Sequence, residues 1–178
     1  NNGADDEKLE AMLRGLAGAD DFEAAFERYF DRDNYLTYLA GCILLGNRRA
    51  ALQDFQLYSP ADSEKWYLFP APTDAVLLEI GDRRRRGLAE EYYGLGMLEP
   101  SLLHRRFLES AANRKALMTK VEELRLILSG GALAELCGAY KKALAPSVGR
   151  QPDYGMLPAS PQATEARIDR IPTLVEEN

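Results

Sequence analysis

Hydrophobic residues near the start of the chain recur with the period of an α-helix. Within residues 6–16 they follow the i, i+3, i+4, i+7 spacing of an amphipathic helix, at Leu9, Met12, Leu13 and Leu16. Asp20 or Asp21 is predicted to cap a second helix, whose apolar stripe is formed by Phe22, Ala25, Phe26 and Tyr29. Asp33 is predicted to cap a third helix, which continues to about Leu45.

The pattern then changes to the short aromatic-rich runs that are typical of strands. Phe55–Tyr58 and Trp66–Phe69 flank seven residues of turn-forming composition, which predicts a β-hairpin. Pro70 and Pro72 should end the second strand, because proline has no N–H to donate to a neighbouring strand. A lone hairpin is too small to be stable, so it is expected to pack against the helices.

Helical spacing returns after residue 100. A helix is predicted to open at Pro100–Ser101, and Asn113 is predicted to cap a longer one that ends at Gly130–Gly131. A further apolar stripe follows at Leu133, Leu136, Cys137, Tyr140 and Leu144. Ser160–Pro161 is predicted to begin a last helix, which Pro172 should bend or end.

These elements predict an α+β fold, mainly α, in which helices pack around one hairpin. We expect one domain over residues 6–145, with the hairpin at residues 54–70. Residues 146–178 are predicted to form a loop rich in Pro and Gly, followed by a helix that packs on the same domain. The first residues lack both an initiator Met and a basic region, which predicts no signal peptide and suggests the interior of a longer polypeptide.

Composition narrows the range of partners. The formal net charge of −6 disfavours general binding to nucleic acid or to an anionic membrane, both of which need a basic face. No apolar run approaches the roughly 18 residues that span a membrane. The local exception in charge is Arg83, Arg84, Arg85 and Arg86, which fits either a solvated loop or a contact for a phosphate or an acidic partner.

Few residues offer conventional chemistry. Cys42 and Cys137 both lie in apolar helical segments, so we interpret them as buried free thiols, although the sequence leaves a disulfide between them open. A search for a catalytic triad fails, because the only histidine, His104, lies on a probable helix and is predicted to be a surface or hydrogen-bonded structural residue. No nucleophile elbow and no phosphate-binding loop is present in the sequence.

One region carries a specific pattern. Residues 31–35 read Asp-x-x-Asn-Tyr, and a predicted helix follows them. After the helix come, in order, Gly46–Asn47, Asp54–Tyr58, Lys65–Trp66, Pro70 and Asp74. This stretch of about 45 residues resembles the CotH family of kinase-like, spore-coat-type secreted proteins, and the helices from residue 102 to residue 128 resemble it with less specificity. The resemblance implies the C-terminal lobe of a kinase-like fold, with no N-terminal lobe in this chain.

The resemblance also implies where phosphoryl transfer would occur, and the residues at those positions are unsuitable. Such transfer needs a carboxylate near the acceptor hydroxyl and oxygen ligands for Mg²⁺ on the phosphates of ATP. The expected catalytic Asp, two residues after Asn47, falls on Arg49, which cannot accept a proton. The expected metal ligands fall on Asp54, which retains an oxygen donor, and on Pro72, which has none, while the last Asp of the motif persists as Asp74. Asn47, Asp54 and Asp74 are therefore the residues that could remain from a nucleotide or metal site.

Three hypotheses follow. The first is a catalytically degenerate CotH-like domain that serves as a binding or structural module without a cofactor. The second is an active phosphotransferase dependent on ATP and Mg²⁺, in which Asp54 and Asp74 hold a metal and the N-terminal lobe lies outside this chain; a turn carboxylate and a cap are the simpler roles for these two residues. The third, without the resemblance, is a helical subunit of a larger assembly.

The first hypothesis requires a surface for a protein partner or for the remainder of a longer parent polypeptide. Candidates are the arginine run at residues 83–86 and the aromatic pair Tyr92–Tyr93. Where a second lobe or a partner would sit, we expect an exposed apolar surface lined by the first helices and the hairpin. Export or attachment to the cell surface follows only from the resemblance.

Overall fold

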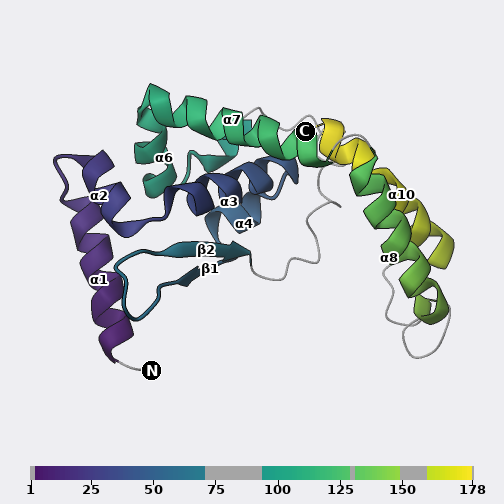
Figure 1. Cartoon of the computed structure of the whole chain (residues 1–178), viewed down its shortest axis with the longest axis horizontal. Helices are drawn as coiled ribbons and strands as arrows, with labels where there is room; N and C mark the ends of the chain where they lie inside the picture. Colours follow the sequence, from purple (N-terminus) through teal and green to yellow (C-terminus); the bar gives the residue numbers. More distant parts are fainter. Residues whose placement is uncertain (1–2, 71–93, 129–130, 149–159, 178) are drawn as a thin grey trace.

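The first part of the chain forms helices followed by a hairpin (Figure 1). The computed structural model describes residues 3–70, 94–128, 131–148 and 160–177, so the arginine run, Pro72, Asp74 and Tyr92–Tyr93 lie outside the described residues. The elements before residue 71 are α1 (Gly3–Ala17), α2 (Phe22–Tyr29), α3 (Arg32–Leu44), α4 (Arg48–Leu52), β1 (Phe55–Tyr58) and β2 (Tyr67–Pro70).

The start of α3 differs from the prediction. The helix begins at Arg32 and is capped by Asp31, whose carboxylate accepts from the Asn34 N–H at 2.8 Å. Both Asp31 and Asp33 are good capping residues, and the fold chooses between them. The Asp31 N–H donates to the Trp66 carbonyl at 3.3 Å, while the Asp33 carboxylate pairs with Lys120 of the later helix α7 at 2.7 Å.

Helices dominate again after residue 93, as predicted. The described elements are η2 (Gly94–Leu98), α6 (Leu102–Glu109), α7 (Ala111–Leu128), α8 (Ala132–Val148) and α10 (Pro161–Glu177). Together with the single two-stranded sheet among the described residues, they confirm an α+β fold that is mainly α. The described helices include none with both the length and the apolar character needed to cross a membrane.

Two predictions about helix ends are wrong. Asn113 does not cap α7, because it lies inside the helix. Its side chain contacts Glu23 and accepts from Arg32 at 2.6 Å. The oxygen near the helix start is the Ser110 hydroxyl, which accepts from the Asn113 N–H. Pro146 does not begin a loop, because α8 continues to Val148. For Pro172, which was predicted to bend or end the last helix, the structure excludes an end: α10 continues to Glu177, and Leu174 and Val175 in its last turn are buried.

The core surrounds α3, which packs against α7 on one side and against β2 on another. Its centre is a group of aromatic rings from α2, from the residue that follows it, and from α3 and α6, namely Phe26, Phe30, Tyr35 and Phe107, with neighbouring centroids 4.7–5.4 Å apart. All four side chains are at most 1% exposed. Phe30 also forms a bridge with Trp66, which connects this centre to the hairpin.

The hairpin is attached to the helices mainly through Asn34 and Trp66. In the antiparallel register, Leu57 pairs with Leu68. The Asn34 side chain binds the backbone of Leu68 at the free edge of β2. Its Nδ2 donates to the Leu68 carbonyl at 3.2 Å, and its Oδ1 accepts from the Leu68 N–H at 2.7 Å. The Trp66 N–H donates to the Tyr29 carbonyl at 2.7 Å. The predicted need for helical support is therefore met by backbone and amide hydrogen bonds.

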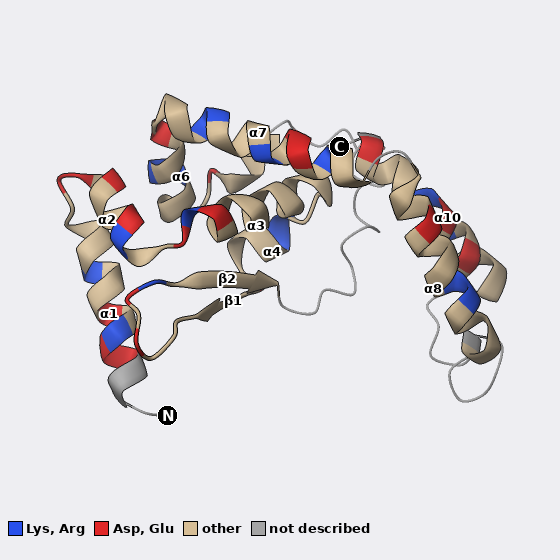
Figure 2. Cartoon of the chain, in the orientation of Figure 1, with Lys and Arg blue, Asp and Glu red and all other residues tan. Residues whose placement is uncertain are grey.

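A two-helix arm, consisting of α8 and α10, extends from the end of α7 away from the hairpin (Figure 1). The two helices pack along each other, and Lys141 pairs with Asp169 between them at 2.7 Å. Figure 2 shows Lys, Arg, Asp and Glu interleaved along the helices, whereas both strands of the hairpin are uncharged. The mixed charge pattern gives the described surface no dominant basic side.

Candidate functional site

The loop between α3 and β1 lies where the resemblance placed the catalytic loop. Gly46 ends α3 with φ of 59°, a left-handed conformation that suits glycine, and its N–H donates to the Ile43 carbonyl at 3.0 Å. The Asn47 N–H donates to the Cys42 carbonyl at 2.8 Å. The chain then turns into the short helix α4 and enters β1, so the loop is tied to the core at its first residues.

Asn47 has a structural role in this loop. It is 8% exposed, and its side-chain oxygen accepts from the Ala50 N–H at 2.9 Å, which caps α4. Tyr38 of α3 supports the same turn by donating its hydroxyl hydrogen to the Ala50 carbonyl at 2.8 Å. The oxygen that a metal would need from Asn47 is therefore engaged with backbone.

Arg49, in α4, and Asp54, just after the end of this helix, contact each other. Their side chains form an ion pair with 2.9 Å between the guanidinium nitrogen and the carboxylate oxygen, and the Asp54 N–H donates to the Arg49 carbonyl at 2.9 Å. Arg49 is 65% exposed at its side chain and Asp54 is 33% exposed. The residue at the expected base position thus neutralises the carboxylate at the expected metal position.

The structure does not assemble a metal site from the described residues. They contain no group of three or more His, Cys, Asp and Glu side chains close enough to hold an ion. Asp54 is joined to a cation, Asn47 caps a helix, and the two other expected positions, Pro72 and Asp74, lie outside the described residues. The two polar side chains that are described at the expected site are thus engaged within the chain, Asp54 with Arg49 and Asn47 with the start of α4.

The two cysteines are both free and buried, as predicted. Burial raises the pKa of the Cys42 thiol to about 12, and it also raises the pKa of Cys137. A thiol must lose its proton to become a nucleophile, so both residues are poorly suited to that role at neutral pH. They act as small apolar side chains.

His104 is a hydrogen-bonded structural residue, which confirms one of its two predicted roles. Its Nε2 lies 2.8 Å from the Ala51 carbonyl, which can only accept, so Nε2 carries the hydrogen and Nδ1 accepts from the Tyr35 hydroxyl at 2.6 Å. Burial lowers the pKa of His104 and raises that of Tyr35, which keeps both groups neutral. Sequence reasoning missed this bridge from α6 to α3 and α4, because its partners are 69 and 53 residues away.

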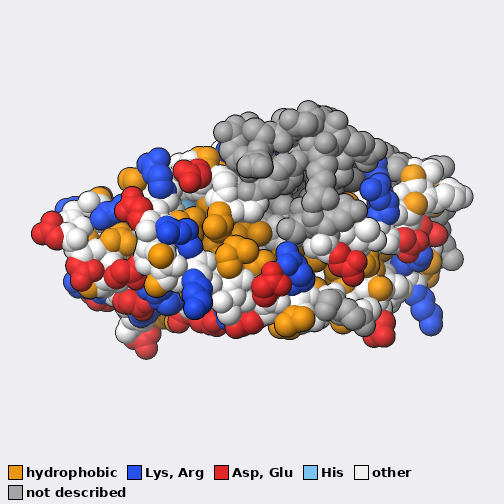
Figure 3. Space-filling view, turned by 90° about the horizontal axis from the view of Figure 1, so that it is seen from above, with side chains coloured by type: hydrophobic (Ala, Val, Ile, Leu, Met, Phe, Trp, Pro, Cys, Tyr) orange, Lys and Arg blue, Asp and Glu red, His pale blue; other side chains and the backbone are white. Residues whose placement is uncertain are grey.

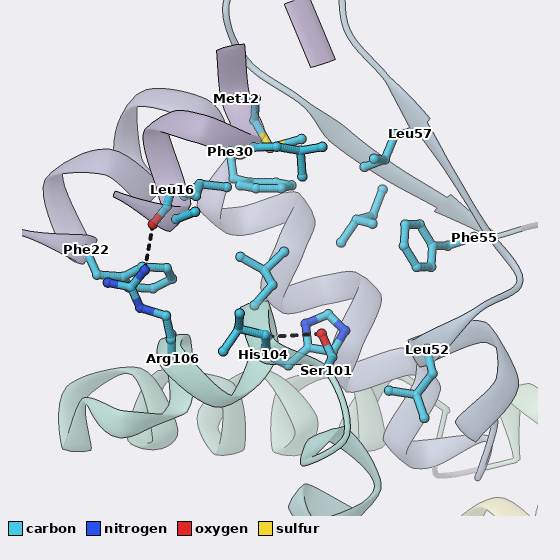
Figure 4. A pocket seen from close by; sticks show the side chains of 15 residues that line it. Met12, Leu16, Phe22, Phe30, Leu52, Phe55, Leu57, Ser101, His104 and Arg106 are labelled. Atoms are coloured by element: carbon cyan, nitrogen blue, oxygen red, sulfur yellow. Dashed lines mark hydrogen bonds between the residues drawn. The ribbon is translucent and has the colours of Figure 1, made fainter. Parts of the chain in front are cut away.

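An apolar groove, with a volume of about 300 Å³, lies between α1, the hairpin and α6. Most of its lining comes from aliphatic and aromatic side chains of these elements, including Met12, Leu16, Phe30, Phe55, Leu57 and Leu68 (Figure 4). Leu13 and Leu102 also line it and remain 54% and 60% exposed. The predicted apolar surface lined by the first helices and the hairpin is thus present, and α6 completes it.

One guanidinium lies among these apolar groups. Arg106 donates to the Leu16 carbonyl at 2.6 Å and to the Ala19 carbonyl at 3.1 Å, and it lies over the Phe22 ring with 4.7 Å to the centroid (Figure 4). Within the described part of the chain, the groups that Arg106 contacts are thus carbonyls and a ring rather than a carboxylate. Figure 3 shows a face of the molecule on which hydrophobic side chains gather between charged ones.

The whole chain matches one protein family. The sequence model of the family described as CotH, CotH kinase protein, matches residues 1–178. Comparison with curated proteins and with solved structures found no match. The family match covers the hairpin, the loop after α3 and the helices that follow, and it removes the hypothesis of an unrelated helical subunit.

Proposed function

This chain belongs to the CotH kinase protein family, and we propose that it is a catalytically degenerate member that acts as a binding or structural module. Family membership supports a kinase-like fold. The loss of catalysis and the binding role are the proposal. Degeneracy is supported by the loop of residues 46–54, and the binding role is supported by the apolar groove.

The Arg49–Asp54 ion pair is the observation that carries the proposal. An arginine cannot act as the general base for a substrate hydroxyl, because it stays protonated and has no acceptor. A divalent ion at Asp54 would also stand close to the guanidinium, since the two side chains are in contact. At ~4 Å in water-like surroundings this repulsion is on the order of 2 kcal/mol, which opposes metal binding.

We assign the groove to an apolar segment of a partner protein that carries an acidic side chain. The assignment follows from complementarity: the lining is apolar apart from Ser101, His104 and Arg106, and Arg106 is the charged residue among them. Among the described residues, its two carbonyl contacts use two of the five guanidinium N–H groups, and the others can donate to a carboxylate. Leu13 and Leu102, both more than half exposed, offer apolar surface at the same place.

A thermal-shift titration with Mg²⁺ and ATP tests the degeneracy. The longest natural form of the polypeptide is used, because a lobe outside residues 1–178 would otherwise be missing from the assay. We expect no metal-dependent rise of the melting temperature in the natural protein, and a small one at most in Arg49→Asp, which restores a carboxylate.

The controls for this titration are Asp54→Ala and Asp74→Ala. A saturable rise in the natural protein that needs Mg²⁺ and disappears in either variant would contradict the proposal. It would favour the alternative, an active phosphotransferase in which these two carboxylates hold the metal. Asp54 is the feature that keeps this alternative specific, since it retains an oxygen donor directly before β1.

A further inference from the structure

The two edges of the hairpin differ in what lies against them. At the edge of β2, the Asn34 side chain binds both the N–H and the carbonyl of Leu68. Residues that face each other in an antiparallel pair either exchange both hydrogen bonds or point both sets of groups outward. Leu57 faces Leu68, so its N–H and carbonyl point away from β2, at the outer edge of β1. The backbone groups of Phe55, two residues earlier, point the same way.

The outer edge of β1 is open within the described part of the chain. Among the described residues, the N–H and carbonyl of Leu57 have no backbone partner. Proteins usually protect such an edge with a charged side chain, a proline or a covering segment, because unpaired N–H and carbonyl groups bind a further strand. The sequence of β1, Phe-Gln-Leu-Tyr, contains neither a charge nor a proline. The outer edge of β1 therefore has the features of a strand-binding surface.

This open edge adjoins the apolar groove. The side chains of Phe55 and Leu57 line the groove (Figure 4). In an added antiparallel strand, the residue opposite Leu57 directs its N–H and carbonyl to Leu57, and its side chain lies on the same face as that of Leu57. Every second side chain of the added strand would therefore extend the apolar lining. The alternate side chains would face solvent, on the same side as the exposed Gln56 and Tyr58.

We propose that a segment of a partner protein binds β1 as an added antiparallel strand, with its apolar side chains in the groove. The proposal rests on the function proposed above, which assigns the groove to an apolar segment with an acidic side chain, and it adds the conformation of that segment. An extended backbone fits the edge because its N–H and carbonyl groups recur at the same spacing as those of β1. The antiparallel direction continues the pairing already present in the sheet.

Strand addition at this site should be weak. β1 has four residues, and the backbone groups at its outer edge are those of Phe55 and Leu57. Their hydrogen bonds set the register and the direction of the segment, while the groove supplies apolar contact area. We expect a dissociation constant between about 1 µM and about 100 µM for a short peptide.

N-methylated peptides test the proposal by fluorescence anisotropy with the full chain, at up to about 500 µM protein. The parent probe is a labelled peptide of about eight residues, capped at both ends, in which valine and threonine alternate between two terminal glutamates. One variant carries N-methyl groups on two central valines, and the matched control carries them on two central threonines. In an antiparallel strand with its valines in the groove, the valine N–H groups face β1. The valine variant should therefore bind at least about tenfold more weakly than the control.

Three results would overturn the strand: no binding of the parent peptide, equal affinities of the two methylated peptides, or weaker binding of the threonine variant. The apolar dye 1-anilinonaphthalene-8-sulfonate separates this failure from failure of the proposed function, because the dye needs an open apolar groove but no backbone pairing. A chain that binds the dye in the groove and gives one of these results would lose only the strand. A chain that binds neither dye nor peptide would lose both proposals.

Leu57→Pro tests the same contact from the side of the chain. Proline removes the N–H that points outward, and the hydrogen bonds between the two strands remain because Leu57 does not bond to β2. Leu57→Ala is the matched control, since it also shortens the groove side chain but keeps the N–H. The parent peptide should bind Leu57→Pro about fivefold more weakly than Leu57→Ala, and equal binding would overturn the pairing.

Sedimentation equilibrium at the same protein concentrations tests a second copy of the chain as the occupant of the edge. We expect a monomer. A natural chain that is dimeric and that Leu57→Pro makes monomeric would assign the edge to a second copy and would overturn the partner segment.

Discussion

The junction between the hairpin and the helices differs sharply from the loop of residues 46–54, although both belong to the same family motif. At the junction, Asn34 makes two hydrogen bonds to Leu68, and Trp66 pairs with backbone of the α2–α3 connection. In the loop, Arg49 stands where a catalytic Asp is expected and forms a half-exposed ion pair. The Asn34 and Trp66 contacts join segments of the fold, whereas the Arg49–Asp54 pair joins two exposed or half-exposed side chains at the proposed site.

Energetics predict that these two regions tolerate substitution differently. Removing a partner from a buried backbone N–H or carbonyl costs about 1–3 kcal/mol per group, because the group was desolvated on folding. A largely exposed ion pair contributes about 0–1 kcal/mol. The loop can therefore lose its chemistry at little cost to stability, provided that Asn47 still caps α4.

The largest effect is expected for Asn34→Ala. The change leaves both the N–H and the carbonyl of Leu68 without their amide partner, at a residue only 4% exposed. We expect the free energy of unfolding to fall by about 2–4 kcal/mol. Urea unfolding followed by circular dichroism measures it.

Two variants sharpen this first result. Asn34→Asp keeps an acceptor for the Leu68 N–H but loses the donor to the carbonyl, so its loss should be smaller than that of Asn34→Ala. Gln56→Ala, on the exposed face of β1, should stay within about 0.5 kcal/mol of the natural chain. A loss below about 1 kcal/mol in Asn34→Ala would break the contrast between junction and loop.

The same contrast explains which parts of the fold the sequence could predict. The hairpin follows from local signals, namely two aromatic runs around a turn, but β2 is Tyr67–Pro70, one residue later than predicted, because Trp66 pairs with Phe30 outside the sheet. The choice of Asp31 over Asp33 as a cap likewise depends on Trp66, which is far away in the sequence. Local patterns predict elements, and distant backbone partners set their ends.

Within the candidate site, the substituted residues could be identified from the motif order, but their contacts could not. The Arg49–Asp54 pair depends on α4, a five-residue helix that the apolar periodicity does not reveal. The hydrogen bonds of His104 join segments more than 50 residues apart, and no spacing rule connects them. The groove was predicted in outline because a second lobe or a partner would need an apolar surface on the first helices and the hairpin, but the contribution of α6 was not predicted.

A smaller effect is expected for the buried bridge at His104, and it depends on pH. Burial lowers the pKa of His104 in the folded state below its ordinary value near 6.5, so the unfolded chain binds a proton that the folded chain resists. Its contribution to stability is full above about pH 6.5 and is lost as the pH falls below that value. Between pH 7.5 and pH 5.5 the loss should be up to about 1.4 kcal/mol.

His104→Gln isolates this contribution from that of the carboxylates. Glutamine can still donate to the Ala51 carbonyl, but it does not titrate. Urea unfolding at both pH values should give a smaller acid-dependent loss for the variant than for the natural chain, whatever the stability of each at the higher pH. Equal losses of stability in the variant and the natural chain would show that the fold does not keep His104 neutral.

The smallest effect on stability is expected at the groove, where the prediction concerns binding. Leu13→Glu combined with Leu102→Glu changes two side chains that are already more than half exposed, so the free energy of unfolding should change by about 0.5 kcal/mol or less for each substitution.

Binding to the groove is measured with the dye 1-anilinonaphthalene-8-sulfonate, which is apolar and anionic, as inferred for the partner segment. Its fluorescence should rise with the natural chain and should lose most of that rise with the double variant, because two carboxylates then repel it from the apolar lining. Met118→Glu, on α7 at 42% exposure, is the control and should leave the dye signal unchanged. A dye signal that survives the double variant, or that Met118→Glu removes equally, would show that the groove is not an open apolar surface, and the binding role would then lose its support.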